Sequence, residues 1–203
     1  MALREEQLQA IRSENNNILL FSGPGTGKSF TIVGYINYLI NKENTVVPPE
    51  NIFILTFTRS ATFELKKEID KLLPGKTNKP HVYTLHGFAL RQLLRNKSVL
   101  SSLPTNFTIA DDFEERHIIQ EDINRFLDIH DIREVRKTFN RLASNWETLN
   151  ADQSDWEQIF DNPAFIGAWR EHRDIYGYAL RSELVYQLKK AFDNNPNINI
   201  EGP

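Results

Sequence analysis

Apolar side chains follow two distinct patterns in the first half of this chain. Short apolar runs at 18–21, 52–57 and 82–84 have the length of strands that are covered on both faces. After each run, apolar residues return every three or four positions, which is typical of an amphipathic helix. A further helix is expected over 3–14, before the first run. Strands that alternate with helices predict an α/β fold, a doubly wound parallel sheet flanked by helices.

After the third run the pattern becomes helical throughout. Asp111 with Glu114, and Asp131 with Glu134, have the spacing of capping boxes that open helices. A last amphipathic helix is predicted over 180–192. Large aromatic residues recur on the faces of these helices, which favours the core of an all-α subdomain over a ligand site. The aromatic set is Phe126, Phe139, Trp146, Phe165, Trp169 and Tyr176, with His172 on the same face.

Charge is distributed unevenly along the 203 residues, whose formal net charge is −3. Residues 59–97 carry 9 basic and 3 acidic side chains, whereas residues 98–203 carry 11 basic and 19 acidic ones. The overall charge argues against a generally basic nucleic-acid-binding protein, but the basic segment suits a groove for a polyanion. It suits a solvated helix face equally well, because acidic residues interleave with the lysines.

Composition narrows the setting of the protein. The chain has no cysteine, which excludes disulfides and thiolate metal sites and agrees with a cytoplasmic protein. No apolar run has the length of a membrane span, so we expect no membrane association. We expect a monomer.

A glycine-rich segment follows the first apolar run and carries the clearest chemistry. It reads Ser22-Gly23-Pro24-Gly25-Thr26-Gly27-Lys28-Ser29 and is followed by Phe30 and a helical pattern. A strand, a glycine-rich turn and a helix form the context of a phosphate-binding P-loop. The glycines let successive backbone N–H groups point toward phosphate oxygens, and the helix adds the positive end of its dipole.

Two residues of this segment have predicted roles in catalysis. Lys28 is expected to reach the β- and γ-phosphates of ATP, and the Ser29 hydroxyl is expected to ligate Mg²⁺. The strict pattern begins with glycine, where this chain has Ser22. Because the functional requirement falls mainly on Gly27, Lys28 and Ser29, the prediction of ATP and Mg²⁺ as cofactors stands. The alternative is a strand-to-helix turn without a ligand.

With these segments placed, the chain resembles over nearly its full length the N-terminal part of a superfamily 1 DNA helicase of the UvrD/Rep type. The segment Leu3-Arg4-Glu5-Glu6-Gln7 resembles the Q motif of that family, which implies that Gln7 reads the adenine edge. Residues 22–29 resemble motif I, in which the family often has a small first residue. The resemblance implies a RecA-like P-loop NTPase fold and translocation in the 3′-to-5′ direction.

Two further segments resemble the motifs that line the path of single-stranded DNA in that family. Residues 56–61 are similar to motif Ia, and residues 84–88 are similar to motif Ib. Hydroxyls and an arginine suit phosphate contacts, and an aromatic ring can stack on a base. The resemblance therefore implies a DNA-binding set of Thr56, Phe57, Thr58, Arg59, Thr84 and His86. Taken without the family, Phe57 reads better as a core residue and His86 as a packing imidazole.

The DExQ motif of the family, which completes Mg²⁺ coordination and activates water, is expected beyond the last helix and is absent. The pair Asp111-Asp112 mimics it after an apolar run, but these acids lead into a capped helix, so we reject that interpretation. Motif III, the second RecA-like domain and its arginine finger are also missing. We therefore expect a fragment that binds ATP and DNA without hydrolysing ATP, and whose partner is the C-terminal RecA-like domain.

The expected organisation has three parts. Residues 1–97 form the RecA-like ATP-binding core, 98–178 a helical insertion, and 179–203 the return to the core. Two other functions stay open at this point. One is a P-loop kinase of a small metabolite, which would need an arginine-bearing lid and an acceptor pocket. The other is a non-enzymatic module that holds nucleic acid or a partner protein.

Overall fold

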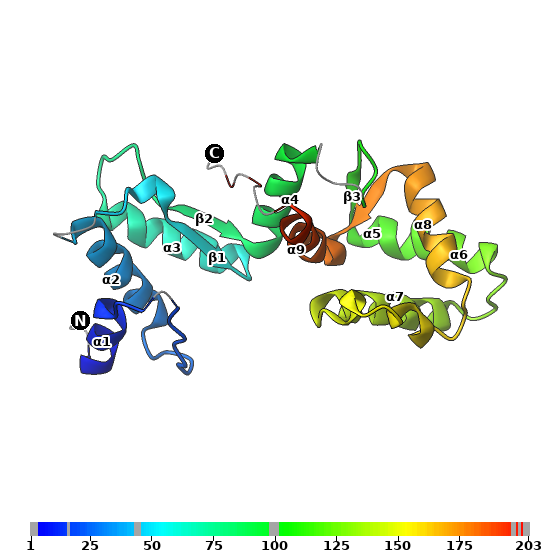
Figure 1. Ribbon diagram of the computed structural model, residues 1–203, viewed down its shortest axis with the longest axis horizontal. Helices are drawn as coiled ribbons and strands as arrows, with labels where there is room; N and C mark the ends of the chain where they lie inside the picture. Colours follow the sequence, from blue (N-terminus) through cyan, green and yellow to red (C-terminus); the bar gives the residue numbers. More distant parts are fainter. Residues whose placement is uncertain are drawn as a thin grey trace. The chain divides into compact units, whose positions relative to one another are not determined.

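The computed structural model describes residues 4–15, 17–42, 46–97 and 102–195, together with positions 198 and 200. The chain divides into two compact units, with the division between Leu85 and His86. Figure 1 shows the order of the helices and strands along the chain. Among the residues described, no helix is long and apolar enough to cross a membrane.

The first unit is a mixed α/β structure. Strands β1 (Phe53–Thr56) and β2 (His81–Thr84) pair in parallel, and helix α3 (Arg59–Leu72) packs against both of them (Figure 1). Helix α2 (Lys28–Asn41) contacts α3 on one side and α1 (Glu5–Arg12) on another. The predicted alternation of strand and helix is confirmed from β1 to β2, and the mixed α/β class with it.

An aliphatic cluster holds the first unit together. The apolar runs of both strands and the inner faces of α2 and α3 meet there, as their periodicity predicts. The buried members are Ile36, Ile52, Ile54, Leu65, Ile69 and Val82.

The strand predicted over 18–21 does not form. The residues of this run have no strand partner among those described, and two of them, Leu19 and Phe21, are 79% and 88% exposed. An apolar run favours burial in a sheet, but it forms a strand only where a neighbouring strand supplies hydrogen-bond partners for its backbone N–H and C=O groups. The structure therefore contains a two-stranded parallel sheet in this unit, and the larger doubly wound sheet stays a prediction.

The second unit is mainly helical. After α4 (Leu85–Arg95) and the short β3 (Thr108–Ala110), the chain forms α5 (Asp112–Glu114), a π-helical turn over Glu115–Ile119, and α6 (Gln120–Phe126). The later elements are α7 (Ile132–Glu147), α8 (Phe165–Tyr176), β4 (Tyr178–Leu180) and α9 (Leu184–Asn194). Short 3₁₀ turns of this unit lie over Asn150–Asp152, Trp156–Ile159 and Arg181–Glu183, and one of the first unit lies over Pro49–Asn51.

Strands β3 and β4 pair in parallel, in the register Thr108 to Tyr178 and Ala110 to Leu180. This sheet was not predicted from the sequence, because strands of three residues are too short to show the alternation of apolar and polar positions. The last helix was also predicted to begin earlier than it does, at Leu180, whereas α9 begins at Leu184 after a 3₁₀ turn. The end of β4 at Leu180 and the 3₁₀ turn over Arg181–Glu183 thus take the place of the first turn of the predicted helix.

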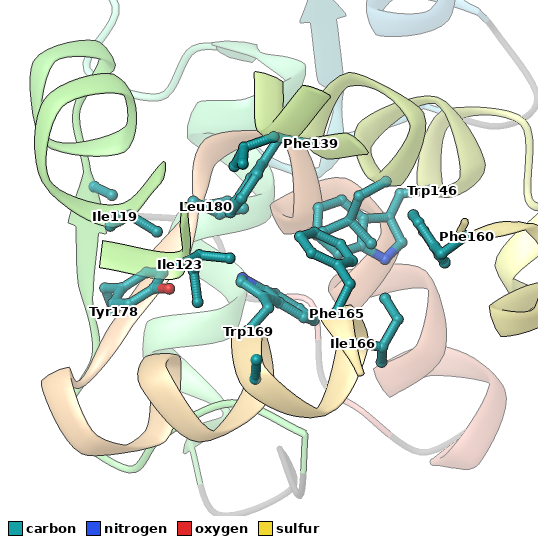
Figure 2. Close-up of a cluster of buried hydrophobic side chains, with 14 of the residues drawn as sticks. Ile119, Ile123, Phe139, Trp146, Phe160, Phe165, Ile166, Trp169, Tyr178 and Leu180 are labelled. Atoms are coloured by element: carbon teal, nitrogen blue, oxygen red, sulfur yellow. The ribbon is translucent and has the colours of Figure 1, made fainter. Parts of the chain in front are cut away.

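Aromatic residues form the centre of the second unit, between α7, α8 and β4 (Figure 2). Phe139 meets Phe165 edge to face, with ring centroids 5.3 Å apart, and Trp146 lies 5.4 Å from Trp169. These arrangements are the favourable ones for aromatic pairs. The prediction that the aromatic residues form a core is confirmed for these four, whereas Phe126 and Tyr176 are exposed.

Both predicted helix starts in this unit are capped by aspartate. Asp111 Oδ1 accepts hydrogen bonds from the N–H groups of Phe113 and Glu114, each at 2.8 Å, and Glu114 Oε2 accepts from the Asp111 N–H at 2.9 Å. This is the complete predicted capping box. At α7 the aspartate half of the predicted box forms, since Asp131 Oδ1 accepts from the Arg133 N–H at 2.8 Å, but no hydrogen bond of the Glu134 side chain to Asp131 is seen among the described residues. The Asp111 carboxylate therefore caps the backbone of α5.

Candidate nucleotide and nucleic-acid sites

The glycine-rich loop reaches α2 through two residues in the left-handed region. Gly25 has a φ of 71° and Gly27 a φ of 89°, and Gly27 is the N-cap of α2. Side chains with a Cβ rarely adopt this conformation, so these two positions require glycine. Gly23 is described as well, and its φ is not positive. The prediction that Gly23 needs a conformation forbidden to other residues is therefore wrong.

Lys28 folds back over the loop that precedes it. Its Nζ donates to the carbonyl oxygens of Ser22 at 2.9 Å and Gly23 at 2.8 Å. The ammonium group thus lies over the start of the loop and next to the N-terminus of α2. Both features attract an anion, because the charge is full and the first N–H groups of a helix have no partner within the helix.

The serine at the first position of the loop takes part in its hydrogen bonding. Ser22 Oγ lies 2.6 Å from Thr26 Oγ1, and Thr26 Oγ1 donates to the Gly23 carbonyl at 2.7 Å. These two bonds tie both ends of the turn together. The departure from glycine at this position is therefore compatible with the loop, and it adds a contact that glycine cannot make.

Gln7 lies beside this loop, although it is 19 residues away from Thr26 in sequence. Its Nε2 donates to the Thr26 carbonyl at 3.3 Å, and its Oε1 accepts from the Arg4 N–H at 2.9 Å. A Cβ on Gly27 would lie only 3.2 Å from Gln7 Nε2. The structure thus brings Gln7 and residues 22–29 into one site, with α1 packed against α2.

The Ser29 hydroxyl suits the role of a magnesium ligand. Ser29 is exposed in the first turn of α2, and its hydroxyl makes no hydrogen bond to a described residue. Among all residues that the structure describes, no group of three or more histidine or acidic side chains could hold a metal ion. A Mg²⁺ ion at Ser29 would take its other ligands from phosphate oxygens and water, which this ion commonly retains. Phe30 follows and is 42% exposed.

The predicted DNA-binding residues Thr56 and Thr84 lie side by side at the carboxyl ends of β1 and β2, where they are register partners. The Thr56 hydroxyl is already occupied, because Thr56 Oγ1 lies 2.7 Å from Thr62 Oγ1 and 3.1 Å from the Thr58 carbonyl oxygen. Thr58 is the N-cap of α3 and accepts from the Ala61 N–H at 3.1 Å. Both hydroxyls therefore hold the β1–α3 junction in shape.

Two other residues at this junction face solvent. Phe57 is 86% exposed, and Arg59 is exposed and makes no ion pair with a described residue. An exposed aromatic ring two positions before an exposed arginine suits base stacking and phosphate contact. Phe63 on α3 was not predicted as a binding residue. It is 59% exposed, and Lys67 Nζ lies 4.3 Å from its ring centroid. The sequence signal that could have indicated Phe63 is an aromatic residue four positions before a lysine on the polar face of a helix.

His86 is the first residue of the second unit. It lies in the first turn of α4 and is partly buried, as is Thr84 at the end of β2. The segment predicted as motif Ib thus crosses the division between the two units, which falls after Leu85.

Comparison with known proteins extends these observations. The family described as UvrD/REP helicase N-terminal domain matches residues 3–199. A probable DNA helicase II homolog of Mycoplasma genitalium is 28% identical to this chain over 197 residues. The alignment covers 95% of this chain and 26% of the length of the relative. A probable DNA helicase of Mycoplasma pneumoniae is 32% identical over 159 residues, which are 75% of this chain and 29% of the relative.

The ATP-dependent DNA helicase PcrA of Staphylococcus aureus is 28% identical over 119 residues, which cover 59% of this chain and 16% of PcrA. The chain therefore spans less than a third of the length of these relatives. The family match covers almost the whole of the chain, including the glycine-rich loop, both strands of the first unit and the helical second unit. The chain therefore belongs to the UvrD/REP helicase N-terminal domain family.

Proposed function

We propose that this chain supplies the ATP-binding site and part of the single-stranded DNA path of a 3′-to-5′ DNA helicase. The observation that carries the proposal is the loop at 22–29, with its two left-handed glycines, Lys28 folded over it and Gln7 at its side. Bound Mg²⁺ would supply charge neutralisation between the phosphates. The chain contributes Lys28 to the phosphates, the Ser29 hydroxyl to the ion and Gln7 to the adenine edge.

Nucleotide binding is tested by calorimetry with ATP and Mg²⁺. Lys28→Ala should remove most of the binding, because the ammonium group is the only full positive charge that the described structure places on the loop. Gln7→Ala should reduce the preference for adenine over guanine. Lys42→Ala is the matched control, since Lys42 follows the other end of the same helix. Unchanged ATP affinity in Lys28→Ala would falsify the nucleotide site.

DNA binding is tested by titration with single-stranded DNA at low salt. Nonspecific affinities of about 10⁻⁴ to 10⁻⁶ M are typical at physiological salt, and this chain should lie at the weak end of that range. Phe57→Ala and Arg59→Ala should each weaken binding, as should Thr84→Ala and His86→Ala. Phe21→Ala is the control for Phe57, because both rings are almost fully exposed in the same unit. Equal losses for Phe21 and Phe57 would remove the specific role of the β1–α3 junction.

We further propose that residues 1–203 alone do not turn over ATP. Phosphoryl transfer depends on positioning and charge stabilisation, and an arginine finger alone contributes about 10³- to 10⁵-fold in rate. A phosphate-release assay should show background rates for this chain. DNA-stimulated hydrolysis is expected in a longer polypeptide that carries the DExQ motif and a second RecA-like domain. Steady turnover that Asp111→Asn or Asp112→Asn abolishes would contradict this, and asparagine keeps the cap at 111.

A further inference from the structure

A group of apolar side chains lies exposed on the second unit, between α6 and α8. Phe126 is 68% exposed, Ile175 is 68% exposed and Tyr176 is 66% exposed. All three line one pocket of about 230 Å³, whose floor includes Ile123 and Ala168. Contiguous exposed apolar side chains around a pocket commonly mark interaction sites, whereas single exposed ones do not. We call this group the α6–α8 surface.

The α6–α8 surface is held in place from beneath. The Tyr176 ring packs against the His172 ring, with centroids 4.4 Å apart. His172 Nδ1 lies 3.1 Å from the hydroxyl of the buried Tyr178, and His172 Nε2 lies 3.5 Å from Asp122 Oδ2. A side chain that is already ordered loses little conformational entropy on binding. Tyr176 is therefore a preorganised contact residue.

The rim of the pocket is acidic. Asp122 and Glu171 line it, and Glu171 makes no ion pair with a described residue. Arg125, the basic residue of α6, lies 3.6 Å from Glu121 and 3.7 Å from Asp122, so that two carboxylates share one guanidinium and a net negative charge remains. A partner with positive charge beside its apolar group therefore fits this rim better than an acidic or neutral one.

We propose that the α6–α8 surface binds a short segment of a partner protein, in which one large apolar side chain is flanked by lysine or arginine. The apolar side chain enters the pocket and packs against Phe126 and Tyr176. The basic side chains lie next to Asp122 and Glu171. The residues that line this pocket all belong to the second unit, and none of them belongs to the candidate nucleotide site of the first.

The test is selection from a random heptapeptide library on residues 1–203, followed by fluorescence polarisation with an enriched peptide. Enriched peptides should carry an aliphatic or aromatic residue next to lysine or arginine. Phe126→Ser with Tyr176→Ser should weaken binding at least tenfold. Glu171→Gln should weaken it by a few fold and reduce its salt dependence. Phe113→Ser is the matched control, because Phe113 is 65% exposed on the same unit and does not line the pocket.

Ile175→Lys provides a second variant that does not depend on removing aromatic rings. Ile175 is exposed, so the change should preserve the fold, and the added positive charge should repel a basic peptide. Enrichment of acidic peptides, or equal binding by all these variants, would overturn the proposal. A concentration-dependent dimer in sedimentation, lost in the Phe126→Ser, Tyr176→Ser variant, would assign the surface to a second copy of the chain and overturn it as well.

Discussion

The two units use their apolar residues in different ways. The main buried cluster of the first unit is aliphatic, and large apolar side chains at Phe21, Phe57 and Phe63 face solvent. In the second unit the aromatic residues fill the core, as Phe139, Phe165 and Trp169 do. The first unit thus exposes three aromatic side chains that lie in or near the candidate binding segments of the sequence, whereas the second unit buries most of its aromatic residues in its core. The predictions below test this difference, beginning with the largest effect.

A buried ion pair between Arg173 of α8 and Glu183 of the 3₁₀ turn before α9 has no counterpart in the described core of the first unit. Glu183 is fully buried, and its Oε1 accepts from the Leu180 N–H at 2.8 Å. Its Oε2 accepts from Arg173 at 3.4 Å and from Gln187 at 3.0 Å. Burial raises the pKa of Glu183, and the Arg173 guanidinium offsets part of this effect.

Glu183→Ala should therefore be the most destabilising change. Removing one partner of a buried pair costs about 3 to 5 kcal/mol, because the other charge loses its compensation. Urea unfolding followed by tryptophan fluorescence measures the effect in the second unit alone, since all three tryptophans lie there. Glu147→Ala, at an exposed position on α7, should change the free energy of unfolding by less than about 0.5 kcal/mol. A small effect at Glu183 would contradict its structural role.

A matched pair of leucines tests the contrast between the units directly. Leu142 in the second unit is 0% exposed, and Leu19 in the first is 79% exposed. Leu142→Ala should cost about 2 to 5 kcal/mol, because it leaves a cavity in a packed core. Leu19→Ala should change the stability of the first unit by less than about 0.5 kcal/mol. Tryptophan fluorescence reports the former and hydrogen exchange of α2 and α3 the latter. Comparable losses at both positions would show that the 18–21 run is packed.

The helix caps offer a smaller comparison. Asp111 accepts two backbone hydrogen bonds at the start of α5, whereas Thr58 accepts one at the start of α3. Removing a cap by alanine costs about 0.5 to 2 kcal/mol. Asp111→Ala should lie in the upper part of that range and Thr58→Ala in the lower part. Chemical denaturation with hydrogen exchange resolves the two units, and the reverse order would show that the number of cap bonds does not determine the cost.

Much of the first unit could be predicted from the sequence because its signals are local. The glycine-rich turn, the helix after it and the strands predicted at 52–57 and 82–84 follow from patterns a few residues long, and the strand–helix alternation between the two strands indicates their parallel order. The same patterns gave the site residues, but they did not reveal which hydroxyls are free. Thr56 has its hydroxyl bonded within the fold, whereas Ser29 has no such bond to a described residue.

The sequence by itself thus determined the helices, the Asp111 cap, the glycine-rich loop and the family resemblance, all of which depend on residues near one another or on their order. The tertiary structure alone decided the pairing of β3 with β4, the burial of Glu183 and the exposure of 18–21. Thr108 and Tyr178, which are 70 residues apart, are paired in the sheet, and no local pattern of apolar and polar residues predicts which distant strand a segment pairs with. Burial likewise depends on which surfaces pack together. An apolar run is buried as a strand only where a neighbouring element packs against it.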